Sequence, residues 1–388
     1  MKTALTLLIL LTLFSLNAFA QDFPPHTVLA QNIEGFQFSF HDQTLIGWRG
    51  HEINLWDIAT GTRKTTLKAD GEVRSVSFSF DGKTLASVSG RAIQLWNIAT
   101  GTRKTIDKGN WNSVLFSPVG QILLASERNG KIRLWNVATD LPKVTFEGAG
   151  GSVSFSPDGK TLASTDYEKI NLWNVATGTH KETLKVRTDW IFNILFSPDG
   201  RTLAVETSTT THLWDVETRT HKATLAGFGV FSPDGRTFAI GSGGTIHLWD
   251  VETGNPETTI DTLEGRTELI TDQPPIAQPP IGKPPSFISI TDSRVYTVVS
   301  FSPDGKTLVS ATGALQFNDI TGTDRDLWLT IDLWDVDTRS HKITLDEFKE
   351  TGVYRLLFSP DSQSLAVITT VKSFDNPLFT ILLWDFST

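Results

Sequence analysis

The feature that most constrains this chain is a strand ending, Leu-Trp followed by Asp or Asn, that returns along its whole length. Successive Trp residues of these endings are 40, 39, 38, 41, 35, 85 and 50 residues apart. A spacing near 40 residues indicates one repeated structural unit, which also explains how a chain of 388 residues can form a single domain. The eight endings contain Trp56, Trp96, Trp135, Trp173, Trp214, Trp249, Trp334 and Trp384.

A second marker, Phe-Ser-Pro-Asp-Gly or an altered form of it, precedes each Trp ending once. No ninth copy lies in the gap of 85 residues, so that gap holds an insertion and no hidden unit. The full form begins at Phe155, Phe196, Phe231 and Phe301, and altered forms begin at Phe38, Phe78, Phe116 and Phe358.

Each unit reads as four antiparallel strands. In the second unit, residues 76–78 form an inner strand, Asp81-Gly82 turns the chain, and residues 84–88 return. Residues 93–96 are apolar on both faces, and residues 103–106 are polar, as expected of a buried strand followed by an outer strand. Units of four strands near 40 residues long predict an all-β fold, an eight-bladed β-propeller of four-stranded antiparallel blades.

The paired markers make the chain resemble the WD-repeat family over nearly all of residues 26–388. The family's Gly-His before the inner strand is missing from every unit, and its Asp before the third strand is mostly missing. We therefore expect the family's His-Asp-Ser-Trp hydrogen-bond network not to carry over. The resemblance also implies that an N-terminal strand, here near residues 26–31, closes the ring by completing the last blade.

The first twenty residues are typical of a secretory signal. Lys2 is followed by an apolar run over residues 4–16 and by Ala18-Phe19-Ala20, with small residues at the cleavage positions. The run is too short to span a bilayer comfortably, so we expect cleavage near Ala20 and no membrane insertion afterwards. Residues 21–388 are then one propeller domain without cysteine, a secreted or periplasmic protein of bacterial type and, we expect, a monomer.

Charge and motifs argue against nucleic-acid binding and against catalysis. The net charge of −9 lacks the basic footprint that nucleic acids require. The chain has no nucleophile elbow, no phosphate-binding loop and no HExxH, and no His pair is expected at metal-ligand spacing. We expect no enzyme activity, cofactor or metal. A hidden glycosidase carboxylate pair and a quinoprotein-like site remain as enzyme alternatives.

Three insertions fall in connections on the face that we call top, which carries the links between strands two and three and between successive units. They are a Pro-rich segment of about residues 266–292, residues 312–328 and residues 369–378. Insertions on one face of a repeat array often mark its binding surface. The alternative is that they are tolerated surface loops.

The resemblance implies a non-catalytic scaffold that binds protein partners through the top face. Trp111 and Trp190 leave the repeat pattern and are expected in top loops as exposed contacts. Two alternatives remain: these rings plug the space between blades, or the ligand is a glycan. The expected partner-binding residues are Arg74, Trp111, Asn112, Arg187, Trp190 and Tyr354.

The outer strands carry a ring of lysines, which could bind an anionic polymer but more simply guard exposed strand edges against aggregation. Its members are Lys64, Lys104, Lys143, Lys181, Lys222 and Lys342.

Overall fold

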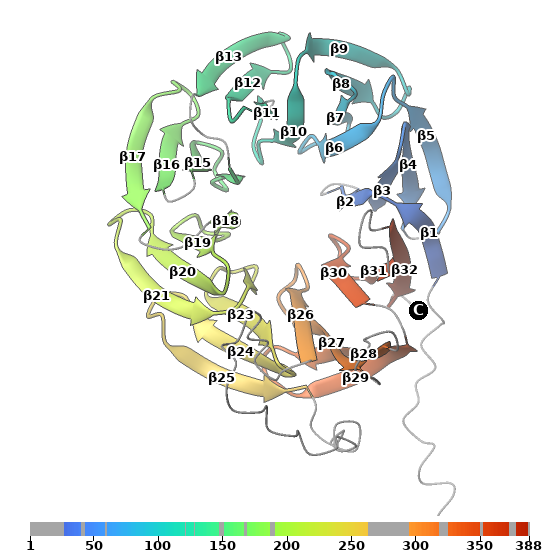
Figure 1. Ribbon diagram of the computed structural model, residues 1–388, viewed down its shortest axis with the longest axis vertical. Coiled ribbons are helices and arrows are strands. Elements are labelled where there is room, and N and C mark those ends of the chain that lie inside the picture. The colour runs from blue at the N-terminus through green and yellow to red at the C-terminus, as the bar shows by residue number, and fades with distance from the viewer. Residues whose placement is uncertain are drawn as a thin grey trace, which may run out of the picture.

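The computed structural model is a ring of eight four-stranded antiparallel sheets around a central channel (Figure 1). It describes residues 27–39, 43–58, 60–120, 122–127, 129–146, 151–166, 169–186, 191–262, 295–317, 325–349, 352–371 and 378–386. None of these residues lies in a helix that is long and apolar enough to cross a membrane. The proposed signal segment and the Pro-rich insertion lie outside the described residues.

The first four blades follow the chain in order, each with its innermost strand first. Blade 1 is β2 (Gly35–Phe38), β3 (Thr44–Arg49), β4 (Glu52–Asp57) and β5 (Arg63–Lys68). Blade 2 is β6 (Val73–Phe78), β7 (Thr84–Ser89), β8 (Ala92–Asn97) and β9 (Arg103–Lys108). Blade 3 is β10 (Trp111–Phe116), β11 (Ile122–Glu127), β12 (Ile132–Asn136) and β13 (Leu141–Phe146). Blade 4 is β14 (Val153–Phe155), β15 (Thr161–Asp166), β16 (Lys169–Asn174) and β17 (His180–Lys185).

The next three blades continue this order, and the last one differs. Blade 5 is β18 (Asn193–Phe196), β19 (Thr202–Glu206), β20 (Thr210–Asp215) and β21 (His221–Ala226). Blade 6 is β22 (Gly229–Phe231), β23 (Thr237–Ser242), β24 (Thr245–Asp250) and β25 (Pro256–Asp261). Blade 7 is β26 (Val295–Phe301), β27 (Thr307–Phe317), β28 (Arg325–Asp335) and β29 (His341–Lys349). Blade 8 is β30 (Gly352–Phe358), β31 (Ser364–Val371), β32 (Leu378–Asp385) and, from the start of the chain, β1 (Thr27–Ile33).

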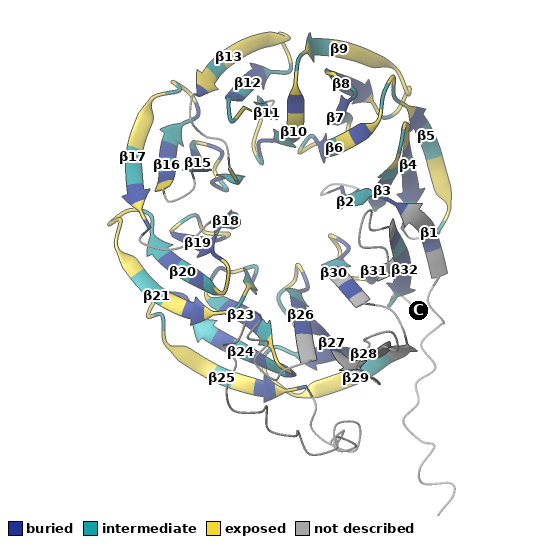
Figure 2. Ribbon diagram, viewed as in Figure 1, coloured by how far each residue is buried: buried dark blue, intermediate teal, exposed yellow. Residues whose placement is uncertain are grey.

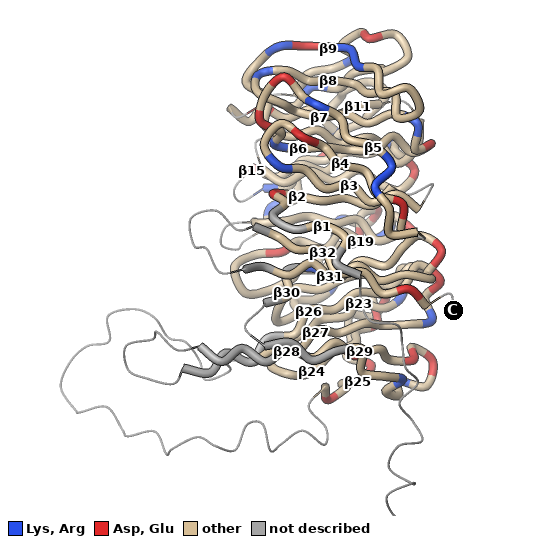
Figure 3. The backbone as a smooth tube through the Cα atoms, turned by 90° about the vertical axis from the view of Figure 1, so that its right-hand side faces the viewer, with Lys and Arg blue, Asp and Glu red and all other residues tan. Residues whose placement is uncertain are grey.

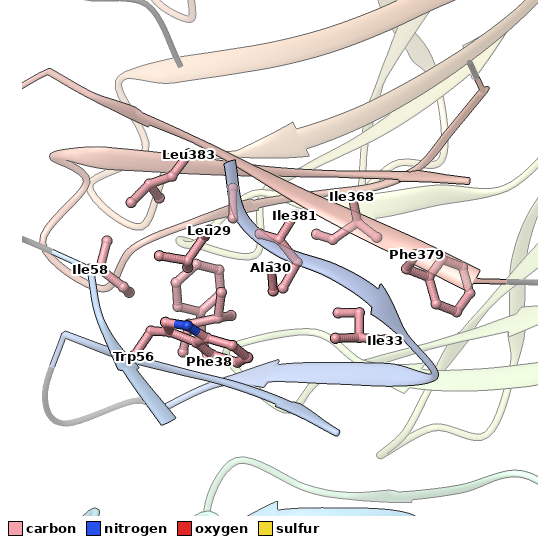
Figure 4. Packing of buried hydrophobic residues seen from close by; sticks show 12 residues of the cluster. Leu29, Ala30, Ile33, Phe38, Trp56, Ile58, Ile368, Phe379, Ile381 and Leu383 are labelled. Atoms are coloured by element: carbon pink, nitrogen blue, oxygen red, sulfur yellow. The ribbon is translucent and has the colours of Figure 1, made fainter. Parts of the chain in front are cut away.

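The closure expected from the sequence is confirmed. Strand β1 pairs antiparallel with β32, with Thr27 opposite Leu383 and Ile33 opposite Phe379. Figure 4 shows how side chains of both strands meet those of blade 1, including Trp56, in one apolar cluster. Pairing β1 in this way covers an edge of β32 that would otherwise be open.

The Trp of each strand ending packs between blades, as predicted. Trp56, Trp96, Trp135, Trp334 and Trp384 are buried, and the other three are half-buried. Trp96, for example, shares a cluster with Ile46 and Ile53 of blade 1. Figure 2 shows middle strands such as β7 and β8 mostly buried and the outer strands largely exposed. Burying these large rings at each blade junction is what holds neighbouring sheets together.

The Phe-Ser-Pro-Asp-Gly marker is a hydrogen-bonded turn on the bottom face, opposite the top face. In blade 2 the Ser79 hydroxyl donates to Asp81 Oδ1 at 2.6 Å, and the Thr84 amide donates back to Ser79 Oγ at 3.0 Å. Gly82 has a φ of 65°, which glycine adopts without strain. The same Ser-to-Asp bond recurs at Ser156, Ser197, Ser232, Ser302 and Ser359.

Two of the expected loop insertions are partly strand. Strand β27 continues to Phe317 and β28 begins at Arg325, with these two residues paired. Thr312 through Phe317 therefore extend the hairpin of blade 7, so this part of the insertion lies within a strand and not in the connection where it was expected. In blade 8, β31 likewise runs to Val371 and β32 starts at Leu378. The reason is that ladder hydrogen bonds continue wherever the two lengthened strands stay in register.

Candidate functional site

Exposed side chains at the entries of three inner strands share one position in the sequence of their units. We call it the rim position: the residue four before the Phe that ends each inner strand. Arg74, Asn112 and Phe192 occupy it in blades 2, 3 and 5, and all three are exposed. The Arg74 guanidinium donates to the Gly90 carbonyl at 3.1 Å, which holds it against the top hairpin of blade 2.

Trp111 does not lie in a top loop, and its expected exposure is wrong. It is the first residue of β10, its side chain is only 1% exposed, and its ring centroid lies 5.1 Å from that of Trp135 in edge contact. The Arg133 guanidinium stacks over the same ring at 5.1 Å. Trp111 packs among apolar residues of blades 2 and 3. The alternative, a plug between blades, is therefore correct for this residue.

The other expected partner-binding residues divide into two groups. Arg74 and Asn112 are exposed, although both lie within inner strands. Tyr354 lies within strand β30 and not in the loop before it, and its side chain is outside the described residues. Arg187 and Trp190 also fall outside the described residues.

Two exposed aromatic residues on the top face were missed by the sequence analysis. Phe192 occupies the rim position of blade 5 and is 63% exposed, and Phe228 of blade 6 is 49% exposed. Phe192 is fixed because its amide donates to the Glu206 carbonyl at 2.8 Å. The sequence did contain a signal for them. In blades 5 and 6 a second Phe comes three or four residues before the Phe that ends the inner strand, whereas blades 2 and 3 have polar residues at the rim position.

Beneath Phe192, a polar network joins blades 4 and 5. Ser152 Oγ donates to Asn193 Oδ1 at 3.1 Å, and Asn193 Nδ2 donates to Glu206 Oε2 at 3.0 Å. Burial raises the pKa of Glu206, while the hydrogen bonds from Asn193 and from the Gly229 backbone oppose that rise. Because its carboxylate already accepts these bonds, Glu206 serves to brace the inner strands below the exposed ring.

The bottom face has clefts between blades. One of about 550 Å³ lies between blades 2 and 3 and is lined by Phe80, Trp96, Phe116 and the Arg103–Lys104 pair, among others. Phe80 replaces the Pro of the repeated turn and is 51% exposed. A more polar cleft of about 1090 Å³ lies between blades 5 and 6. Both have the size of ligand pockets, on the face where no binding surface was expected.

Four of the six outer-strand lysines form ion pairs at the bottom turns, namely Lys64, Lys104, Lys222 and Lys342. Lys64 pairs with Asp57 at 3.1 Å and Lys342 pairs with Asp335 at 3.2 Å, each with the Asp directly after its blade's Trp. Hydrogen bonds from Thr338 and Lys342 lower the pKa of Asp335 to about 2. Figure 3 shows Lys and Arg along the outer strands β5 and β9. These contacts favour a structural role for the lysine ring over anion binding.

No two histidines have the sequence spacing of a metal-binding motif, but strand pairing in blade 5 brings two of them together. His212 Nδ1 and His221 Nε2 lie 3.4 Å apart on the adjacent strands β20 and β21. Burial, and to a smaller extent His221, lower the pKa of His212. Among the described residues, however, no group of three or more His, Cys, Asp or Glu side chains converges on one point.

Comparison with known families finds two matches, each to part of the chain. A model of the WD domain, G-beta repeat, matches residues 219–250, which run from the bottom turn of blade 5 through β24 of blade 6. The same unit builds all eight sheets of the closed ring. The chain is an eight-bladed propeller that contains a repeat of the WD type. A model of eukaryotic translation initiation factor eIF2A also matches residues 50–167, in blades 1 to 4. Comparison with curated proteins finds no match.

The propeller keeps part of the hydrogen-bond network that was expected to be absent. Trp96 Nε1 donates to Ser87 Oγ at 2.8 Å, and equivalent bonds form in blades 4 and 7. The expectation is therefore wrong for the Trp–Ser part of the network in these blades. In blades 5 and 6, Val205 and Ile240 occupy the position of that Ser, and Nε1 of Trp214 and Trp249 has no partner.

Proposed function

We propose that this propeller is a non-catalytic scaffold that holds a protein partner on its top face. The observation that carries the proposal is the pair of exposed phenyl rings, Phe192 and Phe228, at the inner-strand entries of adjacent blades. Large aromatic side chains supply a disproportionate share of the binding energy in protein interfaces.

The position of these rings suits binding for a second reason. The amide of Phe192 is already hydrogen-bonded to blade 5, so little backbone entropy is lost when a partner covers the ring. Trp190 and Arg187, both expected contacts, lie two and five residues before Phe192 in the sequence. Arg74 and Asn112 extend the same rim across blades 2 and 3 with polar groups. Trp111 does not belong to this surface, because its side chain is buried.

The test is capture of a partner by the purified chain, followed by the double variant Phe192→Asp, Phe228→Asp. We expect the affinity for the captured protein to fall at least tenfold, since each Asp places a charge where an apolar contact forms. The matched control is Leu141→Asp on the outer strand β13, because Leu141 is also 63% exposed but lies away from the channel. Leu141→Asp should leave binding unchanged.

Two results would contradict the top-face proposal. If partner affinity survives the double variant and falls instead with Phe80→Asp, the binding surface is the bottom cleft between blades 2 and 3. If a glycan array gives specific binding while no protein does, the scaffold binds carbohydrate. Turnover by the purified chain would contradict the non-catalytic part.

We also propose that the chain is exported, as its first twenty residues suggest, and acts as a monomer outside the bacterial cytoplasm. Expression in a bacterium should yield periplasmic or external protein that starts near Gln21. Mass spectrometry of the N-terminal peptide and light scattering measure the two properties. Recovery of the chain in the cytoplasm with its first residues intact would contradict export.

A further inference from the structure

The outer hairpin of blade 5 brings two imidazole rings together, with their centroids 5.5 Å apart and their planes tilted by 55°. His212 lies on β20 opposite Thr224, and His221 begins β21 opposite Trp214. His212 Nδ1 and His221 Nε2 are 3.4 Å apart, and Thr224 Oγ1 lies 3.0 Å from each of them. Three atoms that can donate a lone pair therefore form a small triangle at the edge of the ring.

The spacing of the two nitrogens matches the requirement of a metal ion. A tetrahedral ion with metal–nitrogen bonds of about 2.0–2.1 Å holds two imidazole nitrogens about 3.3–3.4 Å apart. We propose that His212 and His221 bind a divalent transition-metal ion of the imidazole-preferring class, Cu²⁺, Ni²⁺ or Zn²⁺, with the Thr224 hydroxyl and water completing its coordination. The site lies on the outer strands and is independent of the top-face surface.

The surroundings hold both rings in the orientation that binding needs. Thr210 Oγ1 lies 3.2 Å from His212 Nε2, so a proton on Nε2 can be donated to Thr210 while Nδ1 keeps its lone pair for the ion. The ring of Trp214 packs edge-on against His221 at a centroid distance of 5.4 Å, which limits rotation of that ring. His221 and Thr224 are exposed, so an ion can reach the site from solvent.

The neighbouring lysine does not block the site. Lys222 follows His221 directly, and successive residues of a strand point to opposite faces. Its ammonium group lies 3.7 Å from Asp215 Oδ2 and donates to Thr202 Oγ1 at 3.2 Å, on the side facing the adjacent blade. No positive charge is therefore directed at the two imidazole nitrogens by this residue.

Other blades place different side chains at the same three positions. Blade 4 has Asn171, His180 and Thr183, and there the Thr183 hydroxyl donates to Asn171 Oδ1 at 2.8 Å. In blade 7 the first position is Asp332, which accepts from Thr344 at 2.6 Å and pairs with His341 at 3.1 Å. Blade 6 has a single imidazole, His247, bonded to Thr245 and Thr259. Of these four blades, blade 5 alone combines two imidazoles.

The sister blades also provide substitutions that the fold accepts. His212→Asn installs the residue that blade 4 carries, and His221→Arg installs the residue that begins the outer strand of blades 1 and 2. Each variant removes one nitrogen ligand and leaves a side chain that is compatible with the hairpin. The matched control is His247→Asn, which removes an imidazole that has no second histidine partner at its site.

The experiment titrates CuCl₂, NiCl₂ and ZnCl₂ into the purified chain by calorimetry and records Tm with and without each ion. We expect one saturable site and an ion-dependent rise in Tm. Binding should be tightest for Cu²⁺, because the affinity of nitrogen ligands for divalent first-row ions is highest for Cu²⁺. His212→Asn and His221→Arg should each weaken binding at least tenfold and abolish the rise, while His247→Asn should change neither. Electron paramagnetic resonance of the Cu²⁺ complex should show two nitrogen ligands.

Two outcomes would overturn the proposal. One is a wild-type chain that shows no saturable binding or no two-nitrogen Cu²⁺ signal. The other is retention of the wild-type affinity by both His212→Asn and His221→Arg, with each variant folded as judged by circular dichroism. In either case the two imidazoles only hydrogen-bond through Thr224 and stabilise the hairpin.

Discussion

Removing the hydroxyl that accepts from a blade Trp should destabilise the ring by a measurable amount. In Ser87→Ala, the Trp96 Nε1–H loses its acceptor at 2.8 Å, and both side chains are buried, so water cannot replace it. A buried donor left without a partner costs about 1–3 kcal/mol. We expect Ser87→Ala to lower the free energy of unfolding by about 1–2 kcal/mol, the lower part of this range. The fold tolerates this defect elsewhere, since Nε1 of Trp214 and Nε1 of Trp249 have no hydrogen-bond partner.

A double-mutant cycle with Trp96→Phe isolates the bond. Phe has no N–H, so in that background Ser87→Ala should cost nothing, and the coupling free energy should equal about 1–2 kcal/mol. Urea unfolding followed by far-ultraviolet circular dichroism gives the four free energies. The reasoning is refuted if Ser87→Ala costs the same with Trp96 and with Phe at that position. In the reverse direction, Val205→Thr in blade 5 should be neutral or stabilising, because it offers Trp214 an acceptor of nearly the same shape.

Three further outcomes can be measured. Trp111→Ala should lower the free energy of unfolding by about 3–5 kcal/mol, as for other buried Trp, and unchanged stability would contradict its burial. Deleting residues 21–33 should expose the edge of β32 and cause aggregation, seen by light scattering, while a soluble ring of unchanged Tm would show that β1 is dispensable. Hydrogen bonds lower the pKa of the Asp158 and Asp335 carboxyl groups. The stability that these carboxylates give the folded state is therefore present above pH 4 and is lost as the pH falls toward 2. Asp335→Asn should make the Tm fall less steeply with acid.

The sequence predicted the fold because each blade repeats the same local physics. The Ser–Asp turn and the buried Trp recur in unit after unit, so eight copies can be recognised even where single residues have changed. The ring closure could be predicted because the last unit lacked its fourth strand and the start of the chain offered one. Repeated hydrogen bonds and repeated burial leave a periodic record in the sequence.

The site was predicted less well because it depends on register irregularities that leave no such record. The pairing of β10 with β11 shifts between Trp111 and Ser113, and β6 and β30 shift at the equivalent point. Such a bulge reorients the flanking side chains, and here Trp111 is buried while Asn112 is exposed. The histidine pair was missed for a related reason. Nine residues separate His212 from His221, and only the shifted pairing of β20 with β21 brings their nitrogens together.

The pairing of β1 with β32 sets an order of events during synthesis of the chain. Strand β1 is made first, but its hydrogen-bonding partner is made last, more than 300 residues later. Until β32 is available, seven blades can form as an open arc while β1 has no edge to pair with. Joining such distant segments is slow, because the entropy of closing the loop is lost before the new contacts form. We therefore expect the pairing of β1 with β32 to be the final step of folding. It converts an open arc of blades, which exposes a strand edge at the last blade, into a closed ring.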